Sequence, residues 1–322
     1  RQRQMCIRDR HMFFGAERLI EMRRFILASD HEARIGALEK IRTYQVEDFE
    51  AIFRLSQDRP TIVRLLDPPL HEFLPSSDED IASVAEQLDI PKDVLRKRIA
   101  ELNEVNPMLG HRGCRLAITY PELYEMQVEA IIESVLKLKK EGIECHPEIM
   151  IPLVSTVEEF ITLKGRLAET ITQLENDAKT NVNYLIGTMI ETPRACLIAQ
   201  QLAQHCDFFS FGTNDLTQLT YGFSRDDAGK FINVYTESNI LQIDPFQTLD
   251  KDGVGQLIQY AVEQAKQIKP EIKIGVCGEL GGDAKSIHQF NQWSIDYVSC
   301  SPFRVPGAIL ATAQSQAEES ER

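Results

Sequence analysis

Two acidic residues follow short runs of the sequence that have the composition of buried strands. Glu191 follows residues 186–190, and Asp215 ends the sequence FFSFGTND. Two carboxylates at neighbouring strand ends suit Mg²⁺, which binds one or two carboxylates and keeps other positions for substrate oxygens and water. Alternatively, Glu191 opens the helix that starts at Thr192, and Asp215 caps the helix after it. Spacing alone leaves both interpretations open.

The turn before Asp215 is rich in small and capping residues. Gly212, Thr213 and Asn214 would lie between a strand and a helix. Successive backbone N–H groups at a helix N-terminus can bind a carboxylate or a phosphate. The alternative is an ordinary connection between a strand and a helix.

Arginines supply candidate anion ligands. Arg64 lies inside an apolar strand pattern, where an unpaired arginine is unfavourable, and its planar fork can bind two oxygens of a phosphate or carboxylate. An internal ion pair with Asp67 or with a glutamate is the alternative. Arg112 and Arg115 lie beside glycines that permit close approach of a ligand, although one of the two can simply be solvated.

Cys277 ends another apolar run, and a thiol there can act as a nucleophile or as a general acid and base. A small buried hydrophobic residue is the alternative. Four other cysteines are expected to serve packing: Cys114, Cys196, Cys206 and Cys300. His71, His111 and His146 lack the spacing of metal ligands, so we expect structural or surface roles for them.

These residues require strands and helices that bring them together. Six apolar runs predict buried parallel strands: residues 61–67, 148–154, 184–191, 207–212, 272–278 and 296–301. Helical patterns lie between or beside them: residues 17–27, 46–55, 78–102, 121–140, 157–174, 193–204, 255–267, 284–291 and 305–313. A weaker run near residues 114–118 and one strand near the N-terminus would make eight. The pattern predicts an α/β fold, a (β/α)8 TIM-type barrel with extra helices early in the chain, with an open doubly wound sheet as the alternative.

Composition excludes several classes of protein. The 322 residues include 35 Lys and Arg against 49 Asp and Glu, a net charge of −14, which argues against nucleic acid as a partner. No apolar stretch has the roughly 18–20 residues of a membrane-spanning helix, so no membrane association is expected. Seven scattered cysteines without a CxxC pair predict reduced thiols and a cytoplasmic protein.

Longer motifs resemble a known family. DFFSFGTNDLTQLT, residues 207–220, is similar to the signature of the phosphoenolpyruvate-utilising enzymes. Further motifs resemble the C-terminal domain of the pyruvate, phosphate dikinases within that family: TIVRLLDPPLHEFLP, NPMLGHRGCRLAITYPE, GTMIETPRA, YGFSRDDAGKF and VSCSPFRVPGA. The resemblance covers residues 11–315. It implies a (β/α)8 barrel that binds phosphoenolpyruvate and pyruvate with Mg²⁺.

The resemblance also implies roles for single residues. Glu191 and Asp215 match the metal ligands, and Arg64 and Arg112 match arginines that hold the phosphoryl group and the enolate oxygens. Cys277 matches the proton donor and acceptor at C3 of the substrate. The turn residues Gly212, Thr213 and Asn214 match the loop that receives the substrate carboxylate, and Arg8 matches a phosphate-binding arginine of the first strand.

The chain departs from the family pattern in two places. MCIRDR stands where the family has a strand reading like GLCRTEH, so residues 1–10 are interpreted as a non-native or damaged N-terminus. Leu280 replaces a histidine that many dikinases have, which is a local similarity to enzyme I of the sugar phosphotransferase system. Residues 316–322 are expected to form a polar tail. The nucleotide-binding and phosphohistidine domains of the dikinases are absent from this stretch.

The expected function is therefore interconversion of pyruvate and phosphoenolpyruvate, with a phosphohistidine on another domain as partner. In the complete dikinase reaction, ATP, phosphate and pyruvate give AMP, diphosphate and phosphoenolpyruvate, and this chain alone is not expected to complete it. The resemblance suggests a homodimer. Alternatives are a barrel of the phosphoenolpyruvate synthase or enzyme I type, a Mg²⁺-dependent aldolase or lyase, and an inactive ligand-binding or dimerisation fragment.

Overall fold

The computed structural model describes residues 5–7, 10–13 and 15–320. The chain divides into two compact units. Unit 1 consists of Arg1–Ile149 and Thr162–Tyr184, and unit 2 consists of Met150–Ile161 and Leu185–Arg322. Arg8, which was expected to bind phosphate, lies outside the described residues. Each unit is presented by itself below.

Unit 1 contains a pair of parallel strands. β1 (Met5–Ile7) pairs with β2 (Pro60–Arg64) so that Cys6 lies opposite Ile62. β1 is the strand expected near the N-terminus, so the chain does enter a sheet there. The strand predicted near residues 114–118 is wrong, because this segment is helix α6 (Cys114–Thr119). Its buried residues Cys114, Leu116 and Ala117 form one helix face, and so short an apolar run fits either structure.

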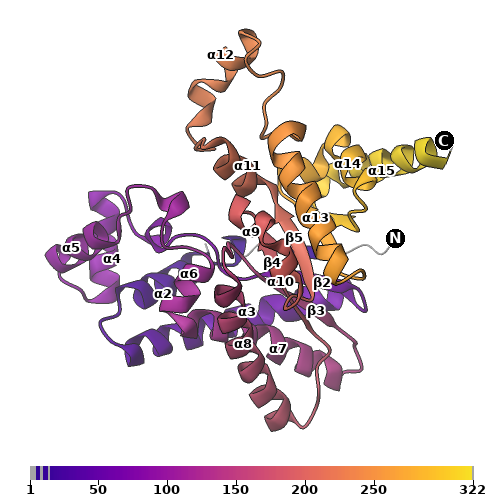
Figure 1. The fold of residues 1–322 in the computed structure, drawn as a ribbon. Helices are drawn as coiled ribbons and strands as arrows, with labels where there is room; N and C mark the ends of the chain where they lie inside the picture. Colours follow the sequence, from indigo (N-terminus) through magenta and orange to yellow (C-terminus); the bar gives the residue numbers. More distant parts are fainter. Residues whose placement is uncertain (1–4, 8–9, 14, 321–322) are drawn as a thin grey trace. The chain divides into compact units, whose positions relative to one another are not determined.

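Helices make up most of unit 1, and three of them precede β2, where the sequence predicted helices over residues 17–27 and 46–55. They are α1 (Arg10–Phe13), α2 (Ala16–Leu27), α3 (His31–Ser56), α4 (Asp78–Leu88), α5 (Lys92–Leu102), α6 and α7 (Pro121–Lys140), with 3-10 turns η1 (Leu70–Phe73) and η2 (Pro107–Leu109). The long helices α3 and α7 pack side by side (Figure 1). The Ser134 hydroxyl donates to the backbone oxygens of Val46 on α3 and Ala130 on α7, at 3.0 and 2.7 Å.

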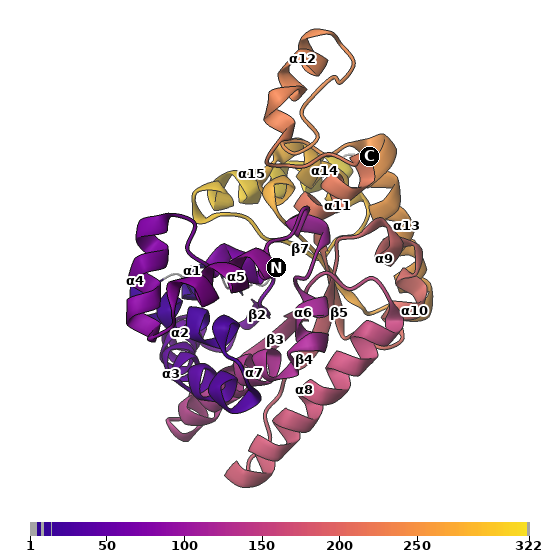
Figure 2. The same cartoon turned by 90° about the vertical axis from the view of Figure 1, so that its left-hand side faces the viewer.

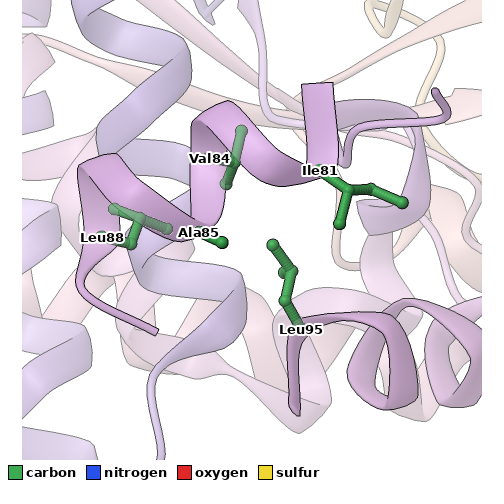
Figure 3. Close-up of a cluster of buried hydrophobic side chains, with 5 residues drawn as sticks. All are labelled: Ile81, Val84, Ala85, Leu88 and Leu95. Atoms are coloured by element: carbon green, nitrogen blue, oxygen red, sulfur yellow. The ribbon is translucent and has the colours of Figure 1, made fainter. Parts of the chain in front are cut away.

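The predicted single helix over residues 78–102 is two helices. Asp89 takes a left-handed conformation (φ 54°) at the end of α4, and Pro91 precedes α5, so the helix cannot continue. The two helices share a small core, in which Ile81, Val84, Ala85 and Leu88 of α4 face Leu95 of α5 (Figure 3).

Unit 2 contains consecutive parallel strands in the order in which they occur in the chain. β4 (Leu185–Ile190), β5 (Phe208–Gly212), β6 (Lys273–Cys277) and β7 (Tyr297–Val298) pair in that order. A doubly wound sheet would reverse its strand order at a switch point. The pairing therefore confirms an α/β fold with parallel strands and does not show that reversal.

β3 (His146–Ile151) crosses the boundary between the units, and α8 (Val157–Ala178) crosses it again. With β3 included, the described residues contain seven strands, one fewer than a closed eight-stranded barrel needs. The six runs predicted from the sequence all overlap strands. Each strand is shorter than its run, and β2 and β3 begin one and two residues before their runs.

The helices of unit 2 follow its strands. They are α9 (Pro193–Leu197), α10 (Ala199–Ala203), α11 (Thr213–Tyr221), α12 (Ile232–Glu237), α13 (Gln256–Ile268), α14 (Ala284–Gln292) and α15 (Val305–Ser320). The segment around α12 extends away from the strands of its unit (Figures 1 and 2). α15 includes residues 316–320, which were expected to belong to a polar tail. Among the described residues, no helix has the length and apolar character needed to cross a membrane.

Candidate functional site

Two arginines share one buried carboxylate at the end of β2. The Arg112 side chain donates from Nε to Asp67 Oδ1 at 3.1 Å and from Nη2 to Asp67 Oδ2. Arg64 donates from Nη1 to Asp67 Oδ2 at 3.2 Å. Arg112 and Asp67 are only 4 % and 3 % exposed. The ion pair of Arg64 with Asp67 is therefore present, and the second arginine joins it.

The backbone around Asp67 is fixed by side chains of α7. Tyr124 donates its hydroxyl to the Leu66 carbonyl oxygen at 2.6 Å, and Gln127 accepts from the Leu66 N–H at 2.8 Å. The Gly113 N–H donates to the Asp67 carbonyl oxygen at 3.2 Å. Gly113 has φ of 57°, a conformation that favours glycine. The glycine beside Arg112 thus serves a sharp turn that brings this arginine to Asp67.

The two arginines change the charge state of Asp67. Burial by itself disfavours the ionised form of Asp67, but the charges of Arg64 and Arg112 outweigh burial, so the pKa of Asp67 is lowered. Guanidinium groups also bind phosphate and carboxylate oxygens through paired hydrogen bonds, so both arginines are of the residue type that holds an anionic ligand.

The neighbours of Arg112 have structural contacts. Arg115 donates to the carbonyl oxygens of Leu109 and Gly110, both at 2.9 Å, and so holds the loop instead of pointing freely to solvent. The His111 ring contacts the Thr119 hydroxyl at 3.0 Å and stacks near Tyr120. The structural role expected for His111 is consistent with these contacts.

In unit 2, Glu191 is buried at the end of β4, with 1 % of its surface exposed. Its Oε1 accepts from the Leu153 N–H at 2.7 Å. The helix α9 that follows is capped by Thr192, whose hydroxyl accepts from Ala195 N at 3.1 Å. Thr192 therefore supplies the cap, and the Glu191 carboxylate is directed elsewhere.

Gly212 leaves the space that the Glu191 carboxylate occupies. A Cβ at Gly212 would lie 2.3 Å from Glu191 Oε2 and 2.7 Å from Met189 Cε. Gly212 is also the residue before α11, and Asp215 lies in the first turn of that helix. The carboxylate of Glu191 thus lies against the N-terminus of the helix that carries Asp215, because β4 and β5 are paired neighbours.

Cys277 ends β6 opposite Gly212 and is 3 % exposed. The Thr213 hydroxyl donates to the Cys277 carbonyl oxygen at 2.9 Å, and Asn214 Oδ1 accepts from the Glu279 N–H at 3.3 Å. The side chains of the turn thus connect it to the end of β6. The structure thus brings together Glu191, the turn at residues 212–214 and Cys277, and it places Asp215 in the first turn of the helix that follows.

Other thiols lie in the protein interior. Burial raises the pKa of Cys196 to about 12 and that of Cys145 to about 11, so both remain protonated at neutral pH. Cys114 and Cys206 are fully buried, and Cys300 is half-buried with a pKa raised by burial. These surroundings fit the packing roles predicted for Cys114, Cys196, Cys206 and Cys300.

Two acidic residues of unit 2 supply oxygen donors. Glu191 and Asp215 are carboxylates, the donor type that Mg²⁺ prefers, and Mg²⁺ keeps water or substrate oxygens in its other positions. No group of three or more His, Cys, Asp or Glu able to hold a metal occurs in the described part of the chain. A metal held by Glu191 and Asp215 stays a prediction.

Leu153 was not recognised from the sequence. Leu153 donates to Glu191 while holding φ at 62°, an uncommon conformation for a bulky residue. No residue pattern signals this backbone angle. Glu279, which the sequence places with Cys277 at the end of a predicted strand, lies near Arg225 and Arg304, with nitrogen–oxygen distances of 3.8 and 3.5 Å.

Comparisons with known proteins show to which family this chain belongs. The family profile described as "PEP-utilising enzyme, PEP-binding domain" matches residues 6–317. Relatives named pyruvate, phosphate dikinase include proteins of Rickettsia bellii (48% identical over 96% of this chain and 35% of the relative) and Rhizobium meliloti (51% over 96% and 34%). A chloroplastic dikinase of Arabidopsis thaliana is 50% identical over 95% of this chain and 32% of its own length. The chain spans about a third of the length of these relatives.

Proposed function

Because this chain belongs to the PEP-utilising enzymes as a PEP-binding domain, we propose that it interconverts pyruvate and phosphoenolpyruvate within a larger dikinase. The observation that supports the proposal is the Asp67 cluster, where two arginines share one buried carboxylate. Such a cluster suits the phosphoryl group and the developing enolate oxygen of these substrates. The closed eight-stranded barrel is part of this proposal.

Residues of unit 2 have roles of their own in the proposed chemistry. Glu191 and Asp215 would hold Mg²⁺, which as a Lewis acid polarises the ketone oxygen of pyruvate when bound. The turn at Gly212, Thr213 and Asn214 would receive the substrate carboxylate at the start of α11. Cys277 would take a proton from the pyruvate methyl group and return it to C3 of phosphoenolpyruvate in the reverse reaction.

Transfer of the phosphoryl group needs a second domain. In this proposal the group moves between the enolate oxygen and a phosphohistidine carried elsewhere in the larger protein. The barrel contributes positioning and charge neutralisation, because phosphoryl transfer asks for little covalent chemistry from the protein. A homodimer and a cytoplasmic location remain predictions.

Calorimetric titration of oxalate, a planar mimic of the pyruvate enolate, into the 322-residue chain tests the proposal. We expect saturable binding that requires Mg²⁺. Asp215→Ala should weaken this binding by at least about tenfold to 100-fold, the range seen when even an outer partner of a metal site is lost. Asp252→Ala, which removes the same charge from an exposed position in unit 2, is the matched control and should bind normally. If the wild-type chain does not bind oxalate, or binds it equally well without Mg²⁺, the proposal is contradicted.

A further inference from the structure

A carboxylate outside both clusters packs into the loop that carries Arg112. Glu104 lies between α5 and η2, and its Oε1 accepts from the His111 N–H at 2.6 Å. A Cβ at Gly110 would lie 2.4 Å from both carboxylate oxygens of Glu104. The Glu104 carboxylate therefore occupies the space beside Gly110, two residues before Arg112.

The backbone of Arg112 is held on both sides. The N–H of the preceding residue, His111, donates to Glu104, and the N–H of the following residue, Gly113, donates to the Asp67 carbonyl oxygen at 3.2 Å. The Arg112 N–H donates to Gly110 O at 3.1 Å. Three consecutive amide groups are thus bonded inside a loop that has no sheet partner to order it.

Such restraint matters for an arginine that binds through two nitrogens. The Arg112 fork reaches Asp67 with both Nε and Nη2, which requires a defined backbone position as well as a defined side-chain rotamer. A small displacement of the backbone misaligns the guanidinium group with a ligand, and misalignment of this kind weakens binding and catalysis steeply.

We propose that Glu104 is a positioning residue that acts on the substrate through Arg112. Its role is to fix the loop over residues 104–113 so that the Arg112 guanidinium group is already oriented before ligand binds. This inference rests on the proposed function for the identity of the ligand. The part of the inference that concerns the orientation of Arg112 before ligand binds does not depend on the proposed function.

The first measurement needs no ligand. In the chain labelled with ¹⁵N-arginine, the Nε–H signal of Arg112 is identified by its loss in Arg112→Ala. Because this group is buried against Asp67, we expect slow exchange with water in the wild-type chain. In Glu104→Ala exchange should become at least about tenfold faster, since the loop opens locally. Glu104→Gln keeps an oxygen acceptor at the same place and should retain the protection.

The second measurement is a double-mutant cycle on Mg²⁺-dependent oxalate binding. Glu104→Ala should raise the Kd about tenfold, equivalent to about 1.4 kcal/mol. In the Arg112→Ala background the same change should have no further effect, because the residue acts through Arg112. Glu101→Ala removes one exposed carboxylate from the preceding helix α5 and should leave the Kd unchanged.

The outcomes separate the two proposals. Unchanged Nε–H exchange in Glu104→Ala would overturn the positioning role whether or not oxalate binds. An equal loss of affinity in the wild-type and Arg112→Ala backgrounds would also overturn it, since that loss would come from general damage to the fold. A wild-type chain that protects Arg112 through Glu104 but binds no oxalate would refute the proposed function and leave the positioning role supported.

Discussion

The two clusters of site residues differ in whether side-chain or main-chain groups hold them in place. In unit 1 a side-chain carboxylate, Asp67, holds both arginines. In unit 2 main-chain groups hold Glu191. The Leu153 N–H donates to its carboxylate, and the absence of a Cβ at Gly212 leaves space for that carboxylate. Changes in the first cluster should therefore affect stability and binding together. Changes in the second should affect stability less.

The largest expected effect on stability is that of Asp67→Asn. The variant keeps the shape of the side chain but leaves two guanidinium groups without their shared carboxylate, and breaking a buried pair costs about 3–5 kcal/mol. Urea unfolding at pH 7 measures this loss. Glu122→Gln is the control, since Glu122 is also a buried carboxylate but pairs with the more exposed Arg34, at 2.8 Å. An equal loss of unfolding free energy in Asp67→Asn and Glu122→Gln would contradict the prediction that Asp67 contributes more to stability than Glu122.

The stability from Asp67 should also depend on pH. Its pKa in the folded protein is lowered, so its contribution is present above the unfolded-state pKa of about 3.9 and is lost as the pH falls through the folded value. The difference in unfolding free energy between the wild-type chain and Asp67→Asn should therefore be constant from pH 7 to about pH 4 and shrink below that. A difference that shrinks already between pH 7 and pH 5 would contradict this assignment.

A smaller effect is expected for Gly212→Ala, which tests the backbone side of the comparison. The new methyl group would collide with Glu191 and Met189, and such overpacking typically costs about 1–3 kcal/mol. It should also displace the Glu191 carboxylate and weaken Mg²⁺-dependent oxalate binding. Gly36→Ala is the control, because this glycine lies in α3 with open space around it and should gain about 0.5–1 kcal/mol. Normal oxalate binding by Gly212→Ala would mean that Glu191 is not held by this contact.

The smallest effect on stability, about 1 kcal/mol, is expected for Cys277→Ala. Its oxalate binding should be preserved, whereas exchange of the pyruvate methyl protons in heavy water should stop, as followed by proton NMR. Cys196→Ala removes another buried thiol, one whose pKa of about 12 keeps it protonated, and should leave exchange intact. Exchange at the wild-type rate in Cys277→Ala would assign the C3 proton to another group.

The sequence by itself determined the strands and the type of residue at each strand end. Apolar runs locate buried strands well, because burial on both faces demands continuous hydrophobicity, and all six runs overlap strands in the structure. The family motifs extended this to roles for Glu191, Asp215 and Cys277, which remain predictions. The prediction of a strand at residues 114–118 failed because a run of four apolar residues and one arginine does not distinguish a helix from a strand.

Only the tertiary structure decided how these residues are held. The sequence left Arg64 as either an anion ligand or a partner of Asp67, and the fold adds Arg112 to the same carboxylate, 45 residues away in the chain. The contact of Glu191 with Leu153 likewise joins residues 38 positions apart. Local patterns record burial and turn preference, whereas contacts between distant residues depend on how strands and helices pack. The physical reason is that a charge is paired by its neighbours in space, which the order of residues along the chain does not specify.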